Sequence, residues 1–99
     1  AGASSWNIVK SPNRFMKTFN MDDSTALISF LDEVYKFQDE TGHHGLFTIN
    51  CYDVTIEIYT HDLNDITELD YEYIAMVDKI YVDICDYINH ETSDELLDW

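Results

Sequence analysis

Apolar and polar residues alternate along the first part of the chain in a way that predicts a β-hairpin. The segment Arg14–Met21 has a period of two, which is typical of a strand with one buried face. The residues on its apolar side are Phe15, Phe19 and Met21. A short strand at Trp6–Val9 precedes this segment, and Pro12 lies between them, where its fixed φ suits a turn. Residues 6–21 are therefore predicted to form a hairpin.

The next segment has helical periodicity, and its apolar arc is wide. Asp22, Asp23 and Ser24 favour a helix start, and Gly42 favours a helix end. One side of the helical wheel carries Ala26, Leu27, Phe30, Leu31, Val34 and Phe37. Ile28 and Tyr35 widen this arc to about 200°, whereas one packing surface needs only about 100°. We therefore expect this helix to pack on a sheet and on a helix of a second copy. The alternative is that Ile28 and Tyr35 are half exposed.

Two further strands are predicted at Leu46–Cys51 and Val54–His61. The second of them alternates, so that one face is apolar and the other is polar and carries His61. The link at Tyr52 and Asp53 is short enough for a two-residue hairpin, although it lacks the favoured glycine.

A second helix is predicted from Glu68 to Asn89. Thr67 and Asp70 have the spacing of a capping box, with Asp in place of the usual Glu or Gln. Residues 91–99 follow the helix as an acidic tail.

The order strand, strand, helix, strand, strand, helix predicts an α+β fold, in which helices pack on one face of a four-stranded antiparallel sheet. With 99 residues, the chain is a single domain spanning residues 1–99. Residues 1–5 show no pattern of secondary structure, and we interpret them as an expression scar or a disordered end.

The charge of the chain excludes two classes of partner. Asp and Glu number 20 against five Lys and Arg, which gives a net charge of −15. Neither nucleic acid nor an anionic membrane surface is expected to bind such a chain, because both need basic residues. Cys51 and Cys85 do not form a CxxC motif and are interpreted as reduced thiols. We expect a cytoplasmic protein, with the nucleus as a second compartment.

Three histidines are candidates for proton transfer. His43 and His44 lie between a helix end and a strand start, and His61 lies at the end of a strand on its polar face. Imidazole has an unperturbed pKa of about 6.5, which suits both acid and base catalysis near neutral pH. The alternatives are surface histidines without a chemical role, or a zinc site formed by these three and Cys51. The zinc reading is disfavoured because no HExxH or CxxC spacing occurs.

Two acidic residues accompany these histidines. Asp70 falls on the apolar face of the second helix within its first turn, where it either caps the helix or points into a cleft beside His61. Asp39 lies in the last turn of the first helix, where it opposes the helix dipole. Asp39 is therefore a candidate for orienting a histidine.

These residues together resemble the pterin-4a-carbinolamine dehydratases. That family has an acidic residue, three further residues, His-His-Pro, an aromatic strand, a Thr-His pair, then Gly-Leu/Ile-Thr/Ser and an Asp. The matching positions here are Asp39, His43-His44, Thr60-His61 and Ile66-Thr67-x-x-Asp70. Trp6 and the aromatic segment Phe15–Phe19 match the first part of the family pattern, and the resemblance continues to about Ile80.

The chain departs from the family pattern at three places. Gly45 stands where the family usually has Pro, which makes the backbone after the histidines less rigid. Asp65 stands where a Gly precedes the Ile-Thr pair, and Tyr52 lies one place from the usual aromatic position, which Cys51 occupies.

The resemblance implies an activity and an assembly. Family members remove water from 4a-hydroxytetrahydropterin to give quinonoid dihydropterin, which recycles tetrahydrobiopterin for aromatic amino-acid hydroxylases. One acid and one base suffice without metal or cofactor, and each contributes about 10²–10⁴-fold to the rate. The resemblance also implies a homodimer or homotetramer formed through the helix at residues 24–41, in agreement with its wide apolar arc.

The resemblance assigns roles residue by residue. His43 and His61 would be the acid and the base, and His44 would hold the pterin ring. Asp39 would orient a histidine, Trp6 would wall the pocket, and Asp70 is carried over as a further substrate-binding candidate. An alternative is a binding module with weak catalysis, because some animal members act as dimerisation cofactors of a homeodomain transcription factor.

Overall fold

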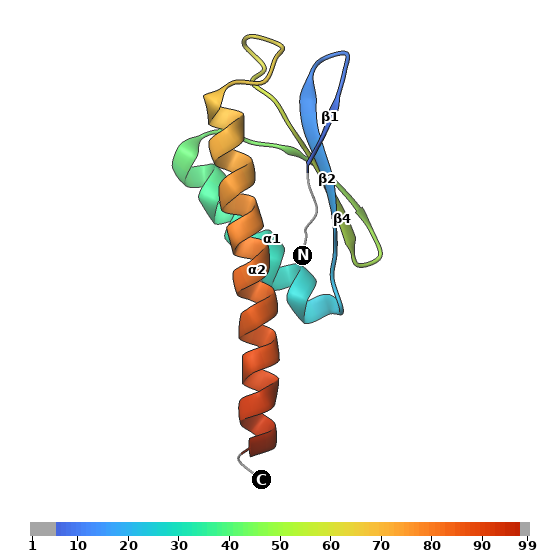
Figure 1. Ribbon diagram of the computed structural model, residues 1–99, viewed down its shortest axis with the longest axis vertical. Helices are drawn as coiled ribbons and strands as arrows, with labels where there is room; N and C mark the ends of the chain where they lie inside the picture. Colours follow the sequence, from blue (N-terminus) through green and yellow to red (C-terminus); the bar gives the residue numbers. More distant parts are fainter. Residues whose placement is uncertain (1–5, 98–99) are drawn as a thin grey trace.

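The computed structural model describes the chain from residue 6 to residue 97, with side chains up to residue 86, and confirms the predicted α+β class (Figure 1). The elements in chain order are β1 (Asn7–Val9), β2 (Arg14–Asn20), α1 (Ser24–Thr41), β3 (Leu46–Asn50), β4 (Asp53–Ile58) and α2 (Glu68–Leu97). The four strands form one antiparallel sheet in the order β1-β2-β4-β3. Figure 1 shows both helices on the same face of the sheet. The expectation for residues 1–5 lies outside the described residues.

The core lies between the sheet and the two helices. The two central strands, β2 and β4, alternate buried and more exposed residues, as their sequences predict. The large buried side chains include Phe15, Phe19, Phe30, Val34, Val54, Ile56, Ile58, Tyr73 and Val77. Each stabilises the fold by about 1.5–3 kcal/mol, because its apolar surface is removed from water.

Helix α1 begins and ends where the sequence predicts. The Asp23 carboxylate accepts a hydrogen bond from the backbone N–H of Ala26 at 3.0 Å, and so caps the N-terminus. At the other end Gly42 adopts a left-handed conformation with φ of 74°, and its N–H donates to the carbonyl of Gln38 at 2.7 Å. The sharp end of α1 places the following residues, His43 and His44, beside the start of β3.

Helix α2 of the same chain packs against α1 and supplies one helix neighbour for the wide apolar arc. Ile28 and Tyr35 stay 66% and 49% exposed in the single chain. The predicted contact with a second copy therefore remains a prediction for this exposed part of α1.

Several element boundaries differ from the sequence prediction, and most of the strand boundaries that differ do so by one residue. Helix α2 continues to Leu97, so the backbone of residues 91–97 is helical, because neither Gly nor Pro interrupts the chain after Asn89. The β3–β4 turn consists of Cys51 and Tyr52, since Asp53 pairs with Asn50 in the sheet. Residues 98–99 of the predicted tail lie outside the described residues.

Strand β4 stops at Ile58, which leaves His61 in the loop that leads to α2.

Within the described part of the chain, neither helix has the length and apolar character needed to cross a bilayer.

Candidate active site

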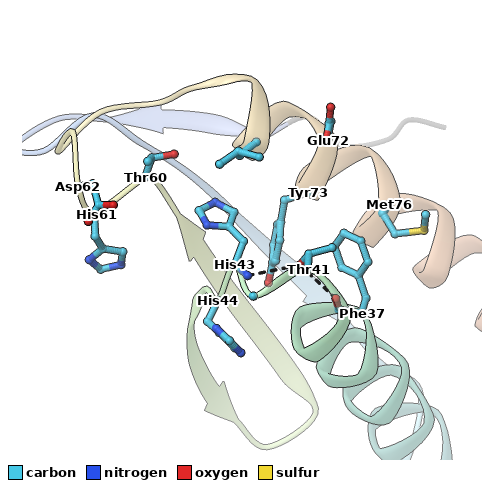
Figure 2. A pocket seen from close by; sticks show the side chains of 12 residues that line it. Phe37, Thr41, His43, His44, Thr60, His61, Asp62, Glu72, Tyr73 and Met76 are labelled. Carbon is cyan, nitrogen blue, oxygen red and sulfur yellow. Dashed lines mark hydrogen bonds between the residues drawn. The ribbon is translucent and has the colours of Figure 1, made fainter.

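A pocket of about 590 Å³ opens where the end of α1, the loop after β4 and the start of α2 come together (Figure 2). This volume is within the range of about 300–1,000 Å³ that is usual for small-molecule sites. Its lining residues are Phe37, Thr41, Gly42, His43, His44, Thr60, His61, Asp62, Leu69, Glu72, Tyr73 and Met76. The structure therefore brings the three candidate histidines to one pocket, from two separate segments of the chain.

The three imidazoles have different surroundings. His43 is mostly buried, and its ring meets the ring of Tyr73 edge-on with centroids 6.0 Å apart. The side chain of His44 is 55% exposed. His61 is exposed on the loop and stacks on Tyr59, with ring centroids 4.2 Å apart. Figure 2 shows the three rings pointing in different directions around the pocket.

A fully buried carboxylate holds His43 in place. Nε2 of His43 lies 2.5 Å from Oδ1 of Asp70, which is on the first turn of α2. The second oxygen of Asp70 accepts from the backbone N–H of Thr67 at 2.9 Å and from the hydroxyl of Thr60 at 2.8 Å. The hydroxyl oxygen of Thr67 in turn accepts from the N–H of Leu69 at 3.3 Å. Thr67 and Asp70 therefore cap the first turn of α2 together, as the spacing of a capping box predicts. Asp70 therefore caps α2, as one of the two alternatives expected, and contacts a pocket histidine, but it is fully buried and does not line the pocket itself.

These hydrogen bonds decide which nitrogen of His43 is left for a ligand. Oδ2 of Asp70 accepts from two donors, and Oδ1 of Asp70 contacts Nε2 of His43. Nδ1 is then the nitrogen of His43 that remains for a ligand. A histidine held by a buried carboxylate in this way can act as a general base.

Asp39 and Trp6 do not line the pocket in this chain. The Asp39 carboxylate is 81% exposed, and its nearest imidazole is His44, with 3.7 Å between Oδ1 and Nε2. Trp6 lies at the start of β1, where its indole N–H donates to Asp78 at 3.0 Å and its ring packs edge-on against Phe19. In the single chain Trp6 ties β1 to α2, and the expectation that it walls the pocket stays a prediction.

The zinc alternative finds no support in the geometry. Cys51 is in the β3–β4 turn, at the opposite end of β3 from His44. In the part of the chain that the structure describes, no group of three or more His, Cys, Asp or Glu side chains could hold a metal ion.

The sequence did not lead us to expect two residues of the site, Gln38 and Tyr73. Gln38 is buried and accepts hydrogen bonds from the N–H of Gly45 at 2.8 Å and from the hydroxyl of Tyr73 at 2.6 Å. Gln38 lies four residues after Val34 and therefore continues the buried stripe of α1. A polar residue at the end of an apolar stripe is the signal that could have identified it.

A sequence profile described as "Pterin 4 alpha carbinolamine dehydratase" matches residues 1–80 of the chain. The chain belongs to this family. The match includes all the pocket histidines, Asp70 and the first half of α2.

Curated relatives carry the provisional name of pterin-4-alpha-carbinolamine dehydratase. A protein of Saccharolobus islandicus is 30% identical over 76 residues, which is 77% of this chain and 77% of the relative. A protein of Chloroflexus aggregans is 31% identical over 75 residues, which is 76% of this chain and 79% of the relative.

Two solved structures share the fold of the dehydratase family. One is described as a transcriptional coactivator/pterin dehydratase of Brucella melitensis, with a TM-score of 0.73, 21% identity, and 77% of this chain and 81% of that chain covered. The other is a pterin dehydratase-like protein described as a RuBisCO assembly factor in the alpha-carboxysome. Its TM-score is 0.70, its identity is 24%, and the match covers 79% of this chain and 90% of that chain.

Proposed function

We propose that this chain dehydrates 4a-hydroxytetrahydropterin to quinonoid dihydropterin and so recycles tetrahydrobiopterin. The observation that carries the proposal is a pocket of pterin-compatible size with three imidazoles on its lining, one of them bound to a buried carboxylate. Membership of the dehydratase family supports the same reaction.

The reaction needs two proton transfers. The bond between C4a and the hydroxyl oxygen breaks, the oxygen leaves as water after accepting a proton, and N5 loses a proton as the C4a–N5 double bond forms. His43 is suited to accept the N5 proton, because Asp70 holds Nε2 and leaves Nδ1 as an acceptor. His61 is suited to donate to the leaving hydroxyl, because its exposed ring exchanges protons with water. His44 holds the pterin ring in this scheme.

The activity is tested with a 4a-carbinolamine that a hydroxylase makes in situ, whose dehydration is followed spectrophotometrically. His43→Ala and His61→Ala should each lower the rate by about a hundredfold or more with the fold intact, as expected for loss of a general acid or base. His44→Ala should mainly raise KM, because it removes a binding contact. Thr48→Ala, a change on the outer face of the sheet, is the control. No acceleration by the wild type, or full rates for both His43→Ala and His61→Ala, would overturn the proposal.

A second copy of the chain is the partner that we propose for the exposed apolar edge. Ile28 and Tyr35 on α1 and Ile49 on β3 are exposed large apolar residues on the helix side of the sheet, and β3 is an edge strand. Such residues usually lie in an interface when they form one surface. Light scattering should give a dimer or tetramer for the wild type and a smaller species for Ile28→Asp.

A binding module without efficient catalysis is the second candidate function. The same exposed apolar residues favour it, and proteins of this fold have been described as a coactivator and as an assembly factor. A chain that forms its oligomer but gives no acceleration of dehydration would favour this function over the first one.

A further inference from the structure

Gln38 binds both ends of the turn that carries His43 and His44. Its backbone carbonyl accepts from the N–H of Gly42 at 2.7 Å, and its side-chain Oε1 accepts from the N–H of Gly45 at 2.8 Å. One residue on the last turns of α1 therefore closes the turn of residues 42–45 at both ends. The Gln38 side chain does not line the pocket, so it acts on the site only through its neighbours.

Tyr73 on α2 fixes the amide of Gln38. Its hydroxyl donates to the same Oε1 at 2.6 Å, and both side chains are fully buried. Burial raises the pKa of Tyr73 well above its ordinary value, so the hydroxyl remains protonated and stays a donor. The ring of Tyr73 also meets the ring of His43 edge-on. Tyr73 therefore contacts the turn from two directions.

Gly45 leaves the space that this arrangement needs. A Cβ atom at position 45 would lie 3.0 Å from the hydroxyl oxygen of Tyr73 and 3.0 Å from the carbonyl oxygen of Glu57. Proline at this position, which the family usually has, would also remove the N–H that binds Gln38. Gly45 therefore leaves room for the hydroxyl of Tyr73 and supplies the N–H that binds Gln38.

We propose that Gln38 is a positioning residue of the pocket, which holds the turn of residues 42–45 through Gly45 and Tyr73 so that His43 meets Asp70. The hydrogen bonds that Gln38 accepts restrict the turn at both of its ends. The catalytic consequence of this proposal rests on the proposed dehydratase function, whereas its structural consequence can be measured without any substrate.

The structural test uses amide hydrogen exchange in the full chain. Gln38→Met removes the acceptor oxygen and keeps a side chain of similar length. Exchange at the Gly45 amide should become about tenfold faster relative to the amides of β2 and β4, since one net hydrogen bond corresponds to about this factor. Gln38→Glu retains an acceptor oxygen and should restore the protection of Gly45.

Val34→Ala is the matched control, because Val34 is buried one helical turn earlier on the same face of α1 and belongs to the core cluster. It should destabilise the whole core and accelerate exchange at all core amides together. Unchanged exchange at Gly45 in folded Gln38→Met, or a uniform increase as in Val34→Ala, would overturn the proposal. If Gln38→Met does not fold, Tyr73→Phe replaces it and should still accelerate hydrogen exchange at the Gly45 amide selectively.

The catalytic test measures how the effect divides between kcat and KM. Gln38→Met should lower kcat about tenfold and change KM by less than about threefold, because the substrate contacts remain while the geometry of His43 is lost. Gln38→Glu should recover most of kcat. A KM effect alone would overturn the positioning role. Inactivity of the wild type would overturn the dehydratase function and leave the exchange test of Gln38 in force.

Discussion

The two sides of the pocket are built in different ways. On one side, His43 lies in a turn that contacts two helices through Asp70, Gln38 and Tyr73, all three of them buried. On the other side, His61 lies on an exposed loop, where its ring stacks on Tyr59. The imidazole of His43 is therefore fixed by contacts with the core, whereas the imidazole of His61 is open to solvent.

Asp70 joins the two sides. One of its oxygens contacts His43, and the other accepts from the hydroxyl of Thr60, which is the residue before His61. The Thr60 hydroxyl also accepts from the hydroxyl of Thr67, with 2.7 Å between the oxygens. A single buried carboxylate thus contacts both the fixed histidine and the start of the loop that carries the exposed His61.

Asp70→Ala should remove hydrogen bonds on both sides of the pocket and cause the largest loss of stability. It leaves the Thr67 N–H, the Thr60 hydroxyl and the His43 ring without their buried acceptor. We expect the free energy of unfolding to fall by about 3–4 kcal/mol, the usual cost of removing one member of a buried polar network. Urea denaturation followed by circular dichroism measures this loss.

Asp70→Asn separates charge from shape in the same experiment. It keeps the size of the side chain, so its loss of stability should be smaller than that of Asp70→Ala. A change below about 1 kcal/mol for Asp70→Ala would show that the network contributes little and that the two sides are independent.

Gly45→Pro should damage only the His43 side. It removes the N–H that binds Gln38, and its Cβ would lie 3.0 Å from the hydroxyl oxygen of Tyr73. We expect a loss of about 2–3 kcal/mol in the free energy of unfolding, from one lost buried hydrogen bond and two close contacts of the new Cβ, with Tyr73 and with the carbonyl oxygen of Glu57. Thermal and urea denaturation check this value.

Two further variants sharpen this result. Gly45→Pro combined with Tyr73→Phe should lose less than the sum of the single changes, because the phenyl ring lacks the oxygen that the new Cβ meets. Gly42→Ala is the control, since a Cβ there meets no atom within 4 Å and costs only the left-handed conformation, about 1 kcal/mol. Strict additivity at Gly45 and Tyr73 would contradict the close contact.

Local sequence patterns predicted most of the fold, because strand periodicity and helix caps are determined by residues close together in the chain. The period of two in β2 and β4 and the caps of α1 at Asp23 and Gly42 each depend on neighbouring residues, and the structure confirms them. The end of α2 was predicted too early because helix length also depends on the absence of a stop signal. The sequence pattern therefore located both ends of α1, which have local capping residues, better than the end of α2.

The site was predicted less completely because its contacts join distant segments. The spacing of the histidines indicated which residues meet, but Asp39, four residues before His43, was the expected orienting acid. The structure places Asp70 in contact with His43, across 27 positions of the chain. Helical wheels showed Asp70 on an apolar face, yet they could not show which side chain it would meet there.

Tyr59→Ala should have a modest effect confined to the His61 side. The stacked rings of Tyr59 and His61 lie 4.2 Å apart, and such a pair contributes about 0.5–1.5 kcal/mol beyond its buried area. We expect a loss of about 1 kcal/mol in stability and a fall in kcat of about threefold, since only the orientation of the proposed proton donor His61 is relaxed. Tyr52→Ala, at an exposed tyrosine of the β3–β4 turn, is the control. A larger effect than that of Gly45→Pro would reverse the comparison between the two sides.

Asp39→Asn should have the smallest effect, although the family pattern gives Asp39 the orienting role. Its carboxylate is exposed and lies 3.7 Å from Nε2 of His44 at the surface, where even a full ion pair contributes only about 0–1 kcal/mol. We expect a stability change below about 0.5 kcal/mol and a dehydration rate within about twofold of the wild type, at low and at high salt. Asp70→Asn, measured in parallel, should lower the rate far more, because it acts on the buried His43. A tenfold loss of rate in Asp39→Asn would instead show that the exposed acid takes part in orienting a histidine, and the pocket would then have two anchored sides.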